Sequence, residues 1–87
     1  IELKLAGHLK EQLGRAASSV ALNLAEGRGR RTLKEQRNFF YTAYGSVKEV
    51  QAILKLAGIN EGKALDLSHA TAAHLYRLLE NLRPPRA

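Results

Sequence analysis

The chain has 87 residues, of which 45% are hydrophobic, and its 14 Lys and Arg against 8 Asp and Glu give a net charge of +6. This composition is typical of one globular domain spanning 1–87, with a modest core and no room for a large catalytic cavity. The absence of cysteine excludes disulfides, thiolate nucleophiles and cysteine-bound metals. No apolar run approaches the roughly 18 residues that a membrane span needs. We therefore expect a cytoplasmic protein without a membrane partner.

Apolar residues recur at spacings of four and three over residues 1–26, which predicts a first amphipathic helix. Its apolar face consists of Ile1, Leu5, Leu9, Leu13, Ala16, Val20 and Leu24. Gly27 and Gly29 follow, and glycine readily takes the positive φ that ends a helix. We expect the first helix to stop there.

A second helix is predicted over residues 32–57. Thr32 and Glu35 form a capping-box pattern, in which each side chain satisfies the other's free backbone N–H. Gly58 fits the position after the last turn, where glycine commonly closes a helix. The residues between these ends that share one face have heptad spacing, and all but Gln36 are apolar: Leu33, Gln36, Phe40, Ala43, Val47, Val50, Leu54 and Ala57.

The third helix is predicted over residues 61–82, with its start at Glu61 or Asp66. Its heptad stripe is Leu65, Ser68, Ala72, Leu75, Leu79 and Leu82, and Pro84 and Pro85 prevent it from continuing. No segment shows the alternation typical of strands. The sequence therefore predicts an all-α fold, an antiparallel helical bundle of three long helices.

The net charge is concentrated between the first two helices. Residues 28–37 contain five basic residues and one acidic residue, so they hold +4 of the chain's +6. Guanidinium groups match phosphate oxygens, and a helix N-terminus adds free N–H donors. We predict a phosphate-binding surface that carries no means of reading bases, and the alternative is a solvated loop. Its residues are Arg28, Arg30, Arg31, Lys34 and Arg37.

Aromatic residues follow this segment and argue against a helix–turn–helix reader, whose recognition helix presents polar side chains near its start. Four aromatic side chains could in principle stack on unpaired bases. Their helical spacing is more typical of a core or a subunit interface, and they are Phe39, Tyr41, Tyr44 and Tyr76. Tyr41 is the exception, because it lies off the heptad stripe and one turn from Arg37. It is the aromatic residue that we expect to face unpaired bases.

Three polar residues near the end of the first helix are predicted to have structural roles. Asn23 and Glu26 lie beside apolar residues, and a buried polar group needs a partner. We expect Glu26 to pair with a basic residue such as Arg15 or Arg31 and so to fix the turn. Gly45 and Ser46 are expected to let two helices approach closely.

The sequence offers no catalytic or metal site. His69 and His74 are five residues apart, which places them on different sides of a helix, and His8 stands alone. Ser18, Ser19 and Ser68 have no His and Asp at a supporting spacing, and the glycine-containing turn does not match a phosphate-binding loop. We expect a nonenzymatic protein without a metal or cofactor.

Several motifs in order resemble the four-helix-bundle family of 23S rRNA intervening-sequence proteins, which is related to the accessory variability determinant (Avd) of diversity-generating retroelements. The family has a Q-x-x-R-A-x-x-S-[IV] run, then N-[IL]-A-E-G with basic residues, then A-x-G-S-x-x-E. The first run is matched here by Gln12, Arg15, Ala16, Ser19 and Val20. The second is matched by Asn23, Leu24, Ala25, Glu26 and Gly27, and the third by Ala43, Gly45, Ser46 and Glu49. The family usually has a further helix ahead of Gln12, so we expect the leading helix to be truncated or missing.

The resemblance implies a homopentamer of helical bundles with a surface that binds nucleic acid, RNA before DNA, and no established catalytic activity. It equally covers a second function, that of a protein-interaction scaffold or an accessory subunit of a retroelement reverse transcriptase. In that case the arginines would face acidic protein instead of phosphate.

Overall fold

Three α-helices make up the computed structural model, which describes residues 6–83. They are α1 (Gly7–Arg28), α2 (Leu33–Leu56) and α3 (Lys63–Asn81). The second and third helices begin and end within two residues of the prediction. The first was predicted from residue 1, but Ala6 has an extended backbone with ψ 148°, and residues 1–5 lie outside the described part. It also continues through Gly27 to Arg28, past the expected end.

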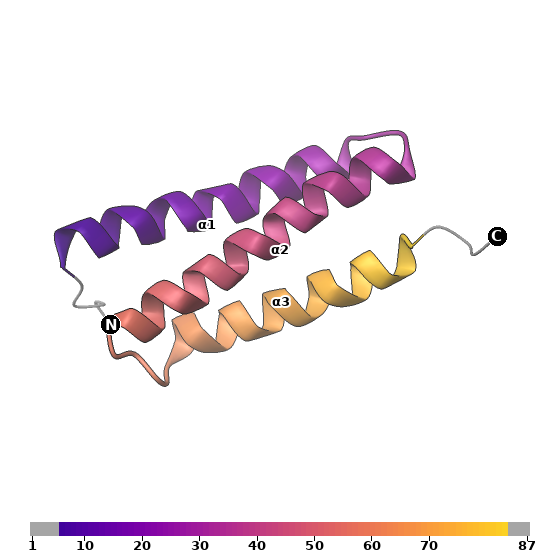
Figure 1. Cartoon of the computed structure of the whole chain (residues 1–87). Helices are drawn as coiled ribbons and strands as arrows, with labels where there is room; N and C mark the ends of the chain where they lie inside the picture. The colour runs from indigo at the N-terminus through magenta and orange to yellow at the C-terminus, as the bar shows by residue number, and fades with distance from the viewer. Residues whose placement is uncertain (1–5, 84–87) are drawn as a thin grey trace.

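The helices form an open antiparallel layer with α2 in the middle (Figure 1). Both outer helices pack on α2, but among the described residues no Cα of α1 lies within 8 Å of a Cα of α3. The layer is elongated, with extents of 48 × 19 × 19 Å, because α2 alone is about 36 Å long at 1.5 Å per residue. The predicted all-α antiparallel bundle is confirmed, and no strand occurs within residues 6–83.

The core lies where α3 packs on α2. The predicted heptad stripes of both helices supply it, and its buried residues are Phe40, Ala43, Val47, Ala72, Leu75 and Leu79. Leu54 and Leu75 are the largest side chains without exposed surface. Leu33, predicted on the same stripe, is instead 52% exposed, because it begins α2 beyond the reach of its neighbours.

The apolar stripe of α1 is only partly covered. Ala16 is buried, whereas Leu9, Leu13, Val20 and Leu24 are half-buried. The reason is the open layer, in which α1 packs on one neighbour and leaves part of its stripe facing the space above α2. A groove of about 190 Å³ lies in that space between the outer helices. Its lining residues are Ala17, Val20, Val47, Val50, Ala64, Leu67, Ser68 and Thr71.

Gly58 closes α2 as the sequence predicts. It has φ +77°, its N–H donates to the carbonyl of Lys55, and the next residue, Ile59, donates to the carbonyl of Leu54. These two bonds define a Schellman motif, which requires a left-handed residue at this position. The turn into α3 is therefore set by a residue without Cβ.

Replacing Gly58 with Ala is expected to lower the free energy of unfolding by about 1 kcal/mol, because an L side chain is strained in the left-handed region. No atom of residues 6–83 lies within 4 Å of a Cβ at this position, so the cost comes from the backbone. Chemical unfolding followed by circular dichroism measures it. Gly58→Asn is the control and should lose less, since Asn tolerates this conformation. Equal losses in both variants would contradict the backbone explanation.

Candidate nucleic-acid interface

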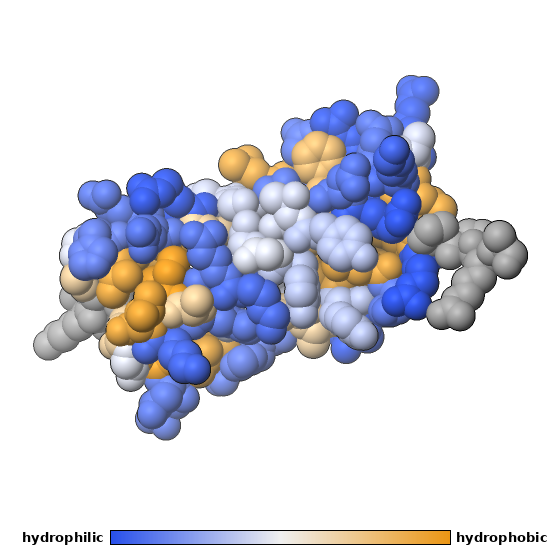
Figure 2. Space-filling model, in the orientation of Figure 1, coloured by the Kyte–Doolittle hydropathy of each residue, from blue (hydrophilic) through white to orange (hydrophobic). Residues whose placement is uncertain are grey.

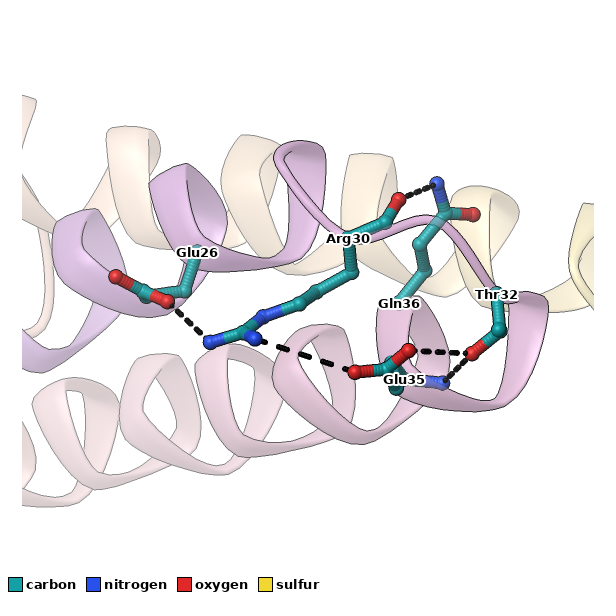
Figure 3. A network of polar contacts seen from close by, with 5 residues as sticks. All are labelled: Glu26, Arg30, Thr32, Glu35 and Gln36. Atoms are coloured by element: carbon teal, nitrogen blue, oxygen red, sulfur yellow. Dashed lines mark hydrogen bonds and ion pairs between the residues drawn. The ribbon is translucent and has the colours of Figure 1, made fainter.

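The turn between α1 and α2 is organised by Arg30 (Figure 3). One guanidinium nitrogen donates to the carboxylate of Glu26 at 2.7 Å, and another lies 3.9 Å from the carboxylate of Glu35. The guanidinium also sits 4.8 Å from the centre of the Phe39 ring. Arg30 thus links the last turn of α1 to the first turns of α2. Each exposed ion pair contributes little to stability by itself, but three contacts fix one side chain.

Three further hydrogen bonds hold the start of α2. The hydroxyl of Thr32 accepts from the backbone N–H of Glu35 at 3.1 Å, as a capping residue should. The same hydroxyl donates to the Glu35 carboxylate at 2.9 Å. This bond takes the place of the expected one, in which the backbone N–H of Thr32 would donate to that carboxylate. The side-chain amide of Gln36 donates to the carbonyl of Arg30 at 3.0 Å. The turn therefore has a defined shape.

Three of the five predicted phosphate-binding residues project from this turn. Arg28, Arg31 and Lys34 are exposed, and within the described chain none of them forms an ion pair. Figure 2 shows hydrophilic side chains gathered over the end of the molecule where α1 passes into α2. Arg30 is paired with Glu26 and Glu35, so Arg28, Arg31 and Lys34 supply the unpaired positive charge of the turn within the described residues.

Arg37 is separate from the exposed cations. It is half-buried beside tyrosines in a hollow between α2 and α3, and its Nε is buried with no hydrogen-bond partner among residues 6–83. The hollow also contains Tyr44, Tyr76 and Arg83, which the sequence interpretation had not assigned to a site. The sequence signal that could have identified this hollow is the spacing i, i+4, i+7, which occurs at residues 37, 41 and 44 and again at 76, 80 and 83.

The polar residues of α1 are placed as follows. The amide of Asn23 donates to the carbonyl of Ser19 at 2.8 Å, and the hydroxyl of Ser19 is 2.7 Å from that of Ser46 on α2. Glu26 does pair with a basic residue, but that residue is Arg30, one helical turn away, and neither of the two examples Arg15 and Arg31. Arg15 is exposed on α1 and joins neither group.

The glycines of this region differ from the predictions. Gly27 does not end α1 but lies buried within it, against the ring of Phe40. Gly29 caps the helix with φ −86°, so neither glycine uses a positive φ. Gly45, expected to permit close helix approach, is exposed with nothing near its Cβ position, whereas Ser46 is buried at the α1–α2 contact. The close approach therefore occurs at Gly27.

Other kinds of site find no support in the described part of the chain. No group of three or more His, Asp or Glu residues is arranged there to hold a metal ion. His69 instead lies 3.2 Å from the side-chain amide of Gln51. Between residues 6 and 83, no helix combines the length and the apolar character that crossing a bilayer requires.

Comparison with known protein families gives a match. The family model described as 23S rRNA-intervening sequence protein matches residues 4–83, which is nearly the whole chain. Neither the curated proteins nor the solved structures compared with the chain gave a match.

Proposed function

Because the chain belongs to the family of 23S rRNA-intervening sequence proteins, we propose that it is a nonenzymatic protein that binds nucleic acid, with RNA as the first candidate. The observation that carries this proposal is the group of exposed cations Arg28, Arg31 and Lys34 on a fixed turn. We call these three residues the turn cations. The wider segment around them holds +4 of the chain's net charge.

Phosphate groups are the ligands that fit the turn cations best. Guanidinium groups form paired hydrogen bonds with phosphate oxygens, and Lys34 adds a mobile point charge in the first turn of α2. Arg30 and Gln36 hold the backbone of the turn, so less conformational freedom is lost when the cations engage. Contacts of this kind position a nucleic acid without reading its sequence.

A salt titration tests the proposal. Filter binding to RNA should weaken steeply as salt rises, by about 0.7 to 0.9 in log slope for each phosphate contact. Replacing the three turn cations with Ala should reduce that slope by roughly 2 to 3 and lower affinity while the helical circular-dichroism signal is retained.

The matched control removes the same charge from the opposite end of the molecule. Lys10, Lys55 and Lys63 are exposed near the start of α1, the end of α2 and the start of α3. Their triple replacement with Ala should change the slope much less. If both triple variants lose equal affinity, the charge acts as a whole and the turn is not the site.

Self-assembly is the second part of the proposal, and the apolar groove between α1 and α3 supports it. Apolar side chains dominate its lining, and a surface of this kind favours protein contact. A homopentamer is the assembly that we propose, with contact to a reverse transcriptase as the alternative use of the same scaffold. Light scattering at micromolar concentration measures the mass, and a monomer would exclude the ring. A wild type that binds no RNA would favour the scaffold function, whereas RNA binding that survives loss of the turn cations would overturn the site assignment.

A further inference from the structure

The hollow between α2 and α3 is lined mainly by aromatic and charged side chains. Its volume is about 290 Å³. Tyr41 and Tyr44 contribute from α2, Tyr76 from α3, and Leu79 from the core. The three tyrosines are all that the chain has, and it contains no tryptophan. We call this hollow the tyrosine pocket; its remaining lining residues are Arg37, Glu80 and Arg83.

Antiparallel packing explains how the pocket forms. Arg37, Tyr41 and Tyr44 occupy positions i, i+4 and i+7 of α2, on one side of that helix. Tyr76, Glu80 and Arg83 repeat the spacing along α3 and the residues after it, in the opposite direction. Arg37 of α2 therefore lies toward the same end of the pocket as Arg83. Tyr44 and Tyr76 lie toward the other end. Two short sequence patterns produce a single pocket.

Two tyrosines of the pocket are too exposed to serve the core, whereas Tyr44 is half-buried and packs against it. Tyr41 is 60% exposed and Tyr76 is 57% exposed, whereas Leu79 beneath them is buried. Aromatic faces left in water are available for stacking, and every nucleobase presents a flat face to match. A base within a duplex is already stacked on its neighbours, so only an unpaired base can use these rings without first breaking the helix.

Charge in the pocket favours an anion at one end. Glu80 pairs with Arg83 at 2.9 Å, which neutralises both, so Arg37 supplies the remaining positive charge. The Nε of Arg37 is a buried donor without a partner within residues 6–83. Leaving such a donor unsatisfied is costly, and a rotation of the Arg37 side chain on binding would bring Nε to a phosphate oxygen that satisfies it. Lys34 lies one helical turn from Arg37 on the same side of α2. A single nucleic-acid strand could therefore contact the turn cations and the pocket together.

We propose that the tyrosine pocket binds an unpaired base of single-stranded nucleic acid, with the base on Tyr41 and Tyr76 and its phosphate at Arg37. The inference rests on the proposed function and sharpens it: the turn cations hold the backbone, and the pocket selects single strands over duplexes. Stacking accepts every base, so the selection concerns strandedness and not sequence.

The test compares a single-stranded RNA of about 12 nucleotides with a duplex of the same sequence at one salt concentration. Replacing both Tyr41 and Tyr76 with Ala should weaken single-strand binding on the order of 10-fold, as loss of base stacking does, and leave duplex binding unchanged. Replacing both with Phe is the matched control and should retain binding, because the rings remain. Both tyrosines are exposed, so the fold should survive, and circular dichroism checks this.

Tyrosine fluorescence supplies a second readout. Since every tyrosine of the chain lines the pocket and tryptophan is absent, emission reports on the pocket alone. Single-stranded RNA should quench it in the wild type, and the turn-cation variant should show the same quenching at higher RNA concentration. Unchanged single-strand affinity in the double Ala variant, or binding without quenching, would overturn the pocket while leaving the turn-cation site in place. A wild type that binds neither RNA would overturn the proposed function as well.

Discussion

Replacing Leu75 with Ala is expected to lower the free energy of unfolding by roughly 3 kcal/mol, within the usual range for deleting a buried leucine side chain. Leu75 has no exposed surface and lies in the core cluster between α2 and α3. The other members of that cluster are themselves buried, so they can fill the cavity only in part. For a domain of this size, that loss is a large part of the total stability.

Urea unfolding followed by far-ultraviolet circular dichroism measures the effect. The control is Leu56→Ala, which removes the same atoms from a side chain that is 76% exposed. That variant should lose less than about 0.5 kcal/mol. Similar losses in the two variants would mean that α3 does not pack on α2 through the heptad stripe.

The parts of the fold that follow from periodicity could be predicted. The heptad stripes of α2 and α3 define the core, since a stripe on one face must be buried against another element. Gly58 was identified as the end of α2 because the left-handed position of a Schellman motif favours glycine over other residues. The burial of α1 could not be predicted, because a stripe does not reveal how many neighbours will cover it. Leu13 and Val20 lie on a good stripe and remain half-exposed.

The candidate site was predicted in composition but not in arrangement. Charge alone identified the basic segment. Only the structure reveals that Arg30 pairs with Glu26 and that Arg37 lies beside tyrosines. Both i, i+4 pairing of Glu26 with Arg30 and a more distant partner were compatible with the sequence. The tyrosine pocket depends on the register of α2 against α3, which places Tyr76 beside the residues that follow Arg37. Register between helices is a tertiary property, and one helix pattern does not determine it.

Gly27→Ala is expected to destabilise the protein by about 2 kcal/mol, although alanine is the better helix former. Gly27 lies within α1, and a Cβ there would be 2.5 Å from Cε1 and 2.9 Å from Cδ1 of the Phe40 ring. Phe40 is only 4% exposed and belongs to the core, so its ring cannot move without disturbing other side chains. The cost of the overlap exceeds the gain in helix propensity. Thermal or urea unfolding measures the difference.

Gly45→Ala is the matched control, because the exchange is the same and, in the described part of the chain, nothing lies within 4 Å of the new Cβ. It should stabilise the protein by up to about 1 kcal/mol, which is the propensity difference alone. The two variants therefore differ in sign. A double variant tests the cause: Phe40→Leu removes the ring atoms that meet the new Cβ, so Gly27→Ala should cost much less in that background than in the wild type. Additive losses would show that Gly27 acts through some other contact. Coupling between them would establish that a missing side chain on α1 sets how closely the first two helices meet, and with it the place of the turn that carries the cations.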